Sequence, residues 1–262
     1  MHHEGYIRLA AFLGALAIVG VWELLAPRRP LTDRKARRWV TNLSLVALGT
    51  LAGRLLLPLL PMGMALLAAE RGWGVLNLLA LPAWLEIVLT LLALDLIIYL
   101  QHVMFHFLPL LWRFHRMHHT DLDLDVTTGN RFHPLEIIIS LWIKLGAVVL
   151  LGAPAAGVLL FEVVLNATAQ FNHGNIHLPL SLDRWLRLVL VTPDMHRVHH
   201  SVIPRETNSN FGFNLPWWDR ICGTYRPQPE AGHLGMSIGL REYRDPARLT
   251  LWQLLLLPFQ KN

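Results

Sequence analysis

Apolar residues gather into five segments along the chain, separated by shorter polar stretches. Residues 6–25, 42–60 and 83–106 each form a mostly apolar run of about twenty residues, long enough for a helix to cross the apolar layer of a bilayer. Residues 136–151 and 155–171 are apolar but shorter, with Gly-Ala-Pro between them. We expect these two segments to form a hairpin that enters the membrane and returns to the same side.

The polar remainder of the chain lies mainly in residues 107–135 and 172–262. Both stretches follow apolar segments that are expected to end on the same side of the membrane, so they should form a joint cap there. The pattern therefore predicts an all-α fold, a polytopic membrane helical domain with a cytosolic, histidine-rich helical cap. We expect one domain over residues 1–262.

The composition agrees with the membrane class of proteins. Hydrophobic residues make up 53% of the chain and charged residues 16%, and the mean hydropathy is +0.40. The only cysteine in the sequence, Cys222, excludes a disulfide framework and a cysteine-based zinc site. Any bound metal must therefore be held by histidine, with carboxylates as the other candidates.

The distribution of charge predicts the orientation in the membrane. The net charge is +5, and a large share of the basic surplus lies between the first two apolar segments, at Arg28, Arg29, Arg34, Lys35, Arg37 and Arg38. Short basic loops face the cytoplasm, so this cluster is a topology signal and does not indicate nucleic acid as a partner. We expect a signal anchor and an integral protein of a bacterial inner membrane, rather than of the endoplasmic reticulum, with its active site facing the cytoplasm.

Ten of the 14 histidines repeat one arrangement twice, a pair followed by a triplet. The pairs have the spacing i, i+4 and the triplets i, i+3, i+4, which places the rings on one face of a helix. The ten are His102, His106, His115, His118, His119, His173, His177, His196, His199 and His200. All ten fall on the predicted cytoplasmic side, and we interpret them as metal ligands.

Ten ligands are too many for one ion, because structural zinc takes four protein ligands and catalytic zinc about three. Two ions with about five nitrogens each would leave an open coordination position on each ion. This arrangement suits octahedral iron better than zinc. We expect no ligand role for His2, His3 or His233, the last as a surface residue, whereas His133 either lines the site or caps a turn.

Polar residues precede both histidine pairs on the same helix face. Asp95 and Tyr99 precede His102, and Asn166 and Gln170 precede His173, at identical intervals. A histidine bound to a metal usually donates its second ring N–H to a carboxylate or carbonyl. We therefore expect these four residues, with His133, to support the ligands from behind. The alternative is that they only bond to other helices or to water.

Several motifs together resemble the fatty acid hydroxylase/sterol desaturase superfamily. The resemblance covers about residues 95–225 and includes LLWRFHRMHHTD, TTGNRFHPLE, NHGNIHLP and TPDMHRVHHS. It implies an integral-membrane, non-haem di-iron oxygenase, with two iron ions held by the ten histidines. The implied reaction is hydroxylation or desaturation of a lipid C–H bond with O2 and external electrons. Zinc is expected to be able to replace iron in a purified sample, because nitrogen sites favour zinc over ferrous iron.

The resemblance also implies partners. These are a membrane lipid as substrate and a separate electron donor with its reductase, of the ferredoxin or cytochrome b5 kind, because no haem-binding HPGG precedes residue 83. Nucleic acid is not expected. Four basic cap residues could dock an acidic electron carrier or instead hold lipid phosphates and local carboxylates: Arg113, Arg116, Arg197 and Arg205.

A histidine-rich membrane metal transporter or metal-binding protein is the main alternative. A transporter would need polar groups through the full depth of the bilayer, whereas here the histidines gather at one end of the apolar segments. A zinc protease is disfavoured because HExxH is absent.

Overall fold

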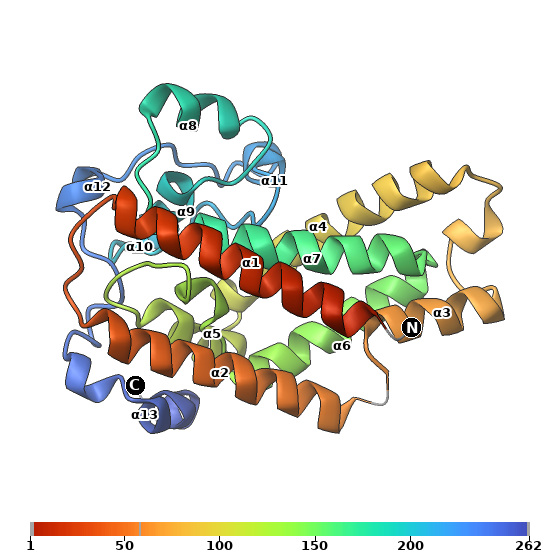
Figure 1. The fold of residues 1–262 in the computed structure, drawn as a ribbon, viewed down its shortest axis with the longest axis horizontal. Helices are drawn as coiled ribbons and strands as arrows, with labels where there is room; N and C mark the ends of the chain where they lie inside the picture. The colour runs from red at the N-terminus through yellow and green to blue at the C-terminus, as the bar shows by residue number, and fades with distance from the viewer. Residues whose placement is uncertain (1–2, 58, 261–262) are drawn as a thin grey trace.

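The computed structural model describes residues 3–57 and 59–260 of the chain (Figure 1). Over these residues the regular structure is helical, and backbone pairing outside helices is limited to two isolated bridges. The predicted all-α fold is therefore confirmed.

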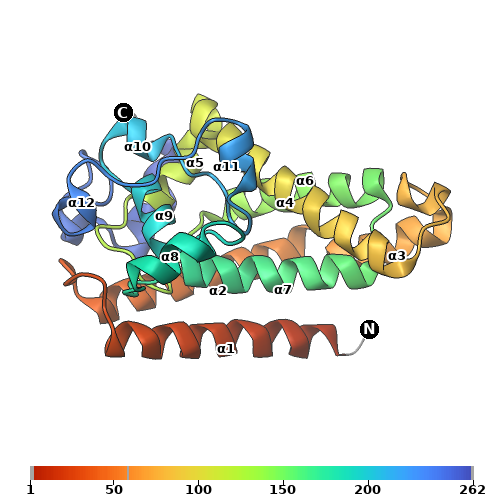
Figure 2. The same cartoon turned by 90° about the horizontal axis from the view of Figure 1, so that it is seen from above.

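Five long helices lie side by side and form the apolar part of the molecule (Figures 1 and 2). They are α1 (Glu4–Leu25), α2 (Lys35–Leu56), α4 (Ala83–Phe107), α6 (Pro134–Leu151) and α7 (Ala155–Asn172). The described residues hold five segments long and apolar enough to cross a membrane, with α2 taken together with the residues up to Leu78. The protein is therefore a polytopic membrane protein.

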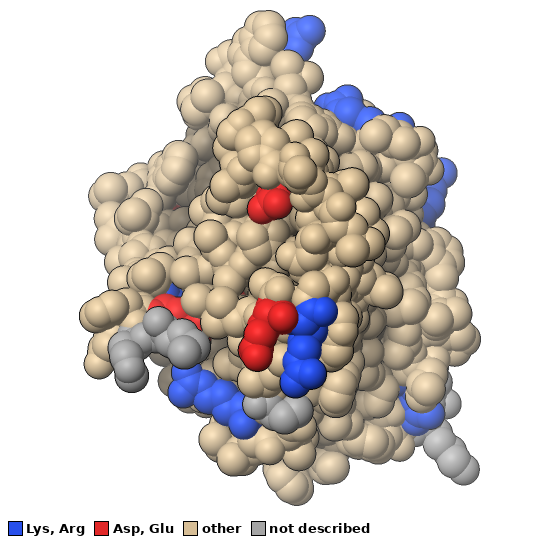
Figure 3. Space-filling view, turned by 90° about the vertical axis from the view of Figure 1, so that its right-hand side faces the viewer, with Lys and Arg blue, Asp and Glu red and all other residues tan. Residues whose placement is uncertain are grey.

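The shorter helices lie at the two ends of the long ones, as Figure 2 shows. At one end, α3 (Pro61–Arg71) and a 3-10 turn (Leu76–Leu78) connect α2 to α4. The cap at the other end holds α5 (Pro109–His119), α8 (Leu180–Leu186), α9 (Pro193–His199), α10 (Pro204–Thr207), α11 (Trp217–Ile221), α12 (Gly232–Gly235) and α13 (Leu251–Leu256), with 3-10 turns at Thr128–Asn130, Pro246–Arg248 and Leu257–Phe259. We call the end with α3 the far end. Figure 3 shows that its surface consists mostly of uncharged side chains, as expected for a face in or near a bilayer.

The hairpin of α6 and α7 turns at the far end. Gly152 ends α6 in the left-handed conformation, φ 67°, which glycine adopts without a steric penalty. Pro154 then precedes α7, which leads the chain back to the cap.

The outer helices α1 and α2 pack on different members of this hairpin. Helix α1 packs on α7 and α2 on α6, and α4 contacts both α6 and α7. Gly49 and Gly53 allow α2 to approach closely, because a Cβ at these positions would lie 3.2 Å from Ile137 and 2.9 Å from Leu141. Helices α1 and α2 meet near the cap, where Lys35 pairs with Glu23 at 3.2 Å.

A buried ion-pair network fixes the loop that follows α5. Arg38 of α2 binds the Asp121 carboxylate through Nε at 2.7 Å and Nη2 at 2.9 Å, and Asp125 through Nη1 at 2.6 Å. Arg131 donates to Asn42 at 2.8 Å. Arg38 is only 3% exposed, so this residue of the basic loop has a structural role besides any effect on topology.

Candidate metal centre

Nine of the ten predicted ligand histidines come together in two adjoining groups. The first group is His102, His106, His115, His119 and His199, and the second group is His118, His173, His196 and His200. Eight of the nine side chains are almost fully buried, and His106 is partly exposed. Within each group, one ring nitrogen per residue lies within 4.8 Å of those of the other members.

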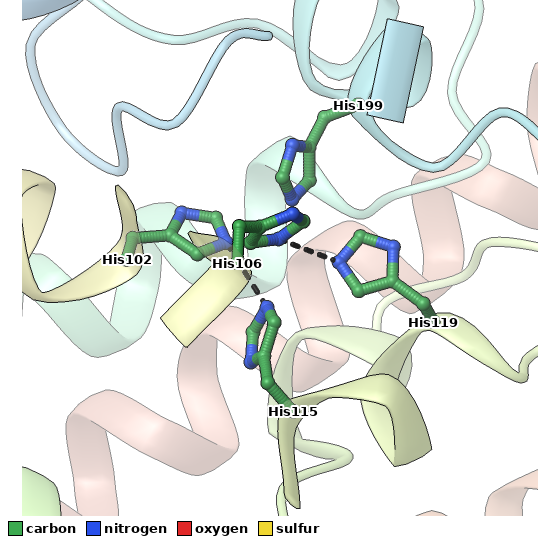
Figure 4. Close-up of side chains that lie close together, drawn as sticks. All are labelled: His102, His106, His115, His119 and His199. Atoms are coloured by element: carbon green, nitrogen blue, oxygen red, sulfur yellow. Dashed lines mark hydrogen bonds between the residues drawn. The ribbon is translucent and has the colours of Figure 1, made fainter. Parts of the chain in front are cut away.

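Three helices supply the first group (Figure 4). His102 and His106 lie on the last turns of α4, and Pro109 begins α5 directly afterwards, so that His115 and His119 face them. His199 comes from α9. Figure 4 shows the five rings pointing toward one another.

The second group also draws on α5. His118 lies between the two first-group residues of that helix, while His173 follows α7 directly, and His196 and His200 belong to the second triplet. The loop that follows α5 can approach α7 only through a glycine, because a Cβ on Gly129 would lie 2.3 Å from the Ala169 carbonyl oxygen.

Backbone carbonyls define which ring nitrogen of three histidines carries the proton. Nδ1 of His102 donates to the Phe211 carbonyl at 2.7 Å, Nδ1 of His199 to Ser209 at 2.8 Å, and Nδ1 of His173 to Ala169 at 2.7 Å. A carbonyl oxygen can only accept a hydrogen bond, so Nδ1 is the protonated nitrogen in the neutral ring. Each Nε2 therefore presents a lone pair to its group.

His115 follows the same rule through a carboxylate. Its Nδ1 lies 2.6 Å from Oε1 of buried Glu136. When this carboxyl group is ionised it accepts the Nδ1 proton in a hydrogen bond, which leaves a lone pair on Nε2. That Nε2 lies 3.1 Å from Nε2 of His102, which also carries a lone pair. Two lone pairs cannot form a hydrogen bond, whereas a cation between them would attract both. The residues present thus fit a bound metal ion.

The second group shows the same surplus of acceptors. Nε2 of His173 lies 3.1 Å from Nε2 of both His118 and His196. One lone pair can accept only one good hydrogen bond, so at most one of these contacts is satisfied in this way. Among the described residues, neither ring nitrogen of buried His200 has a hydrogen-bond partner. Unpaired buried nitrogens are costly, and coordination to an ion would satisfy them.

Burial keeps these rings neutral. It lowers the pKa of His115 and His173 to about 3. For the other cap histidines, burial and their neighbouring rings lower the pKa well below the usual value: His118, His119, His196, His199 and His200. Neutral imidazole is the form that binds metals.

The structure does not bring His177 to either group. The predicted i, i+4 pairing with His173 requires one continuous helix, but α7 ends at Asn172. The chain then runs extended, with Ile176 bridged to Pro27, and the His177 side chain is exposed. The prediction that these two histidines share a helix face is therefore wrong.

Asp95 and Tyr99 were predicted to support His102, but they form hydrogen bonds with residues of the cap instead. Asp95 accepts hydrogen bonds from Trp218 Nε1 at 2.8 Å and from the Leu215 amide at 3.3 Å. The Tyr99 hydroxyl lies 2.9 Å from Thr224 Oγ1. Neither residue has a hydrogen bond to a histidine among the described residues. They hold the segment that contains Phe211, whose carbonyl orients His102, so their effect on the ligand is indirect.

The other predicted supporting residues also bond elsewhere. Gln170 donates to Asn166 at 2.8 Å. His133 is the N-cap of α6, where its side chain accepts a hydrogen bond from the Leu135 amide at 3.1 Å. Its Nε2 donates to the Leu255 carbonyl at 3.1 Å. Of the two predicted roles for His133, the structure therefore shows the capping one.

His233 was predicted to be a surface residue, but its side chain is only 6% exposed because it packs beside Asp194. His3 is exposed, and His2 lies outside the described residues.

Two of the four arginines proposed for docking are inaccessible. Arg116 is 3% exposed and donates to the Leu257 carbonyl at 2.6 Å. Arg197 is fully buried and pairs with Asp194. Arg113 bonds to the Gln260 carbonyl, and Arg205 is exposed and paired with Glu230. For Arg116 and Arg197, local bonding is thus the correct reading.

Glu136 is the supporting residue that the sequence reasoning missed. Its signal was present, because a carboxylate at the start of an apolar helix needs a partner. The sequence could not indicate that the carbonyls of Phe211, Ser209 and Ala169 orient histidines, since every residue has a carbonyl.

A cavity of about 560 Å³ leads to the first group. It lies between α1, α2, α4, α6 and α7, and its lining includes His102 and Glu136. Leu45, Ile98 and Phe105 belong to its apolar wall. Such a cavity can hold an apolar chain next to the histidines.

Comparison with known proteins places the chain in a family. The model of the fatty acid hydroxylase family matches residues 87–224, more than half of the 262 residues. The chain is 32% identical to the ornithine lipid hydroxylase OlsE of Rhizobium tropici over 60% of its own length and 47% of that protein. It is 32% identical to the alkylglycerol monooxygenase of Danio rerio, over 63% of this chain and 36% of that one, and 31% identical to the human one, over 53% and 30%.

The chain spans less than half the length of these curated relatives. No solved structure matches the chain significantly. The family match covers α4 to α11, the part of the chain that holds both histidine groups. The chain therefore belongs to the fatty acid hydroxylase family.

Proposed function

We propose that the protein is a membrane-bound di-iron oxygenase that hydroxylates a C–H bond of a lipid, with O2 and electrons from a separate donor. The observation that carries the proposal is the pair of buried histidine groups, whose ring nitrogens present lone pairs to common points at the end of an apolar cavity. The relatives support the lipid substrate, since their names give an ornithine lipid and an alkylglycerol as substrates.

Each group would hold one iron ion, the first through five histidines and the second through four. Six-coordinate iron would then keep an open position at each group. Bound iron would supply the reduction of dioxygen that oxidation of an unactivated C–H bond needs.

The chain's own residues set the conditions for this chemistry. The Phe211 and Ser209 carbonyls and the Glu136 carboxylate fix the ring orientation of three first-group ligands, so that their lone pairs are aligned in advance. The apolar wall of the cavity excludes water and holds the lipid chain beside His102. Electrons and protons must arrive from outside the cavity, at the cap.

A metal analysis tests the proposal. Protein purified from iron-supplemented cells should contain close to two iron ions per chain, one for each group. The variant His118→Ala/His119→Ala removes one ligand from each group and should lose both ions. Exposed His177→Ala is the matched control and should keep them.

The product completes the test. Membrane lipids incubated with the wild-type protein, a reductant and ¹⁸O2 should gain one ¹⁸O atom per product molecule, and the double variant should give none. Less than one bound ion per chain, unaffected by the double variant, would contradict the proposal. A single, readily exchangeable ion would favour a metal transporter.

A further inference from the structure

The cavity carries a charged cluster at the end away from the histidines. Of the residues that line it, Arg8, Arg54, Lys144 and Glu162 are charged and lie on α1, α2, α6 and α7. We call these four residues the far cluster. The fifth charged lining residue, Glu136, lies at the histidine end.

Three of the four side chains of the far cluster are in direct contact. Lys144 Nζ binds Glu162 Oε1 at 3.0 Å, and Arg8 pairs with the other oxygen of the same carboxylate. Gly53 packs on Leu141, which places neighbouring Arg54 near the level of Lys144. The cluster thus lies where the cavity reaches exposed Leu9 and Leu60, between α1 and α2.

The charges of the far cluster do not balance. Three cations face one carboxylate, and among the described residues Arg54 has no ion pair. The ion pair between Lys144 and Glu162 is sufficient to link α6 to α7. The two arginines are therefore additional positive charges that this link does not require. Charge inside a membrane domain is costly, and a surplus of one sign in a cavity indicates a ligand of the opposite sign.

We propose that the far cluster binds the anionic headgroup, a phosphate or a carboxylate, of the lipid whose chain fills the cavity. The inference rests on the proposed function only in taking the ligand to be a lipid. Phosphate and carboxylate both accept the charge-assisted hydrogen bonds that arginine and lysine donate. A lipid in the leaflet at the far end already points its chain toward the cap, and it enters between α1 and α2.

The spacing of the two ends limits where oxidation can occur. Glu136 and Lys144 are eight residues apart on α6. This separation is a rise of about 12 Å, the length of an extended chain of about nine or ten carbon atoms. Oxidation is therefore expected in the middle of the chain and not beside the headgroup.

Binding of three probes to the full-length protein in detergent tests the headgroup site. The probes are hexadecyl phosphate, hexadecanoate and hexadecanol, with affinities measured by calorimetry at neutral pH. Wild-type protein should bind both anions at least about tenfold more tightly than the alcohol. Preference for one anion over the other would identify which of the two headgroups the site favours, and equal affinity for all three probes would overturn the proposal.

Two variants should shift the anion affinity in opposite directions. Arg54→Gln removes an exposed, unpaired cation and should weaken binding of hexadecyl phosphate about tenfold without changing that of hexadecanol. Arg71→Gln is the control, since Arg71 is also exposed at the far end but does not line the cavity. Glu162→Gln removes the only anion of the cluster and should tighten binding of the phosphate.

The opposite signs distinguish binding from a structural role. If the cluster only linked the helices, Glu162→Gln would lower the thermal unfolding temperature and leave the anion preference unchanged, and the proposal would fail. Binding is measured without turnover. A protein that prefers anions but shows no ¹⁸O incorporation would contradict the proposed function alone, whereas oxidation without a headgroup preference would contradict this inference alone.

Discussion

The two histidine groups share α5 but differ in their access to the cavity. In the first group, His102 lines the cavity and His106 is partly exposed. In the second group, all four members are enclosed and none lines the cavity. A molecule in the cavity can therefore approach the first group through His102, while the surrounding side chains enclose the second.

The groups also differ in what orients their ligands. The first group uses two backbone carbonyls, the Asn208 side-chain oxygen and the carboxylate of Glu136, whereas among the described residues the second has only the Ala169 carbonyl. A charged partner strengthens its histidine as a ligand. The first group can therefore be changed through a side chain that is not itself a ligand.

Adjacent residues of α5 allow the two groups to be separated. His118→Ala leaves three ligands in the second group, and His119→Ala leaves four in the first. Both variants should lose hydroxylation by at least about a hundredfold. We expect His118→Ala to lose its iron more completely, because fewer ligands remain. The iron content per chain after dialysis against a chelator measures the loss. An equal loss in both variants would show that the number of remaining ligands does not decide how firmly each group holds its iron.

Glu136→Gln should weaken the first group alone. The amide keeps the shape but removes the charge behind His115, so iron affinity at that group should fall about 10 to 100-fold. Chelator competition should show one weakened ion and one unchanged. Glu86→Gln, in the first turn of α4 at the far end, is the control. Equal weakening of both ions would mean that Glu136 serves the centre as a whole.

Narrowing the cavity should affect lipid oxidation without affecting iron. Val46 lines the cavity, so Val46→Phe should lower lipid turnover about tenfold through loss of volume, with iron content unchanged. Val40→Phe, on the same helix with Val40 69% exposed and outside the lining, should have no effect. Normal turnover by Val46→Phe would indicate that the substrate takes another route.

Asp95→Asn should have the smallest effect. It weakens the hydrogen bonds to Trp218 and Leu215, at a cost of about 1 kcal/mol in unfolding free energy, and leaves both ions in place. Thermal unfolding and iron content measure the two effects. Iron loss as large as that of Glu136→Gln would restore the direct role predicted from the helix spacing.

The sequence pattern predicted the long helices and the histidine clusters well, because both depend on local spacing. Hydropathy identified the apolar segments that became α1, α2, α4, α6 and α7. The triplets were placed correctly because each lies on or directly beyond one short helix, α5 or α9, where i, i+3 and i+4 share a face.

The failures occurred where the outcome depends on tertiary structure. His177 was assigned by helical spacing, but the helix ends at Asn172 and the chain turns to pair with Pro27. Asp95 faces the cap loop of Trp218, whose position no local pattern gives. His233 appeared to be a surface residue because its neighbours in sequence are Gly and Pro, yet it is buried beside Asp194.

Helix α5 presents consecutive residues, His118 and His119, to different groups. Metal uptake at the two groups should therefore be cooperative. Filling one group restrains α5 and so lowers the entropy cost of filling the other. A titration of the metal-free protein should pass from empty to doubly loaded molecules with few half-loaded ones, and a cell short of iron would hold fewer complete enzymes instead of many incomplete ones.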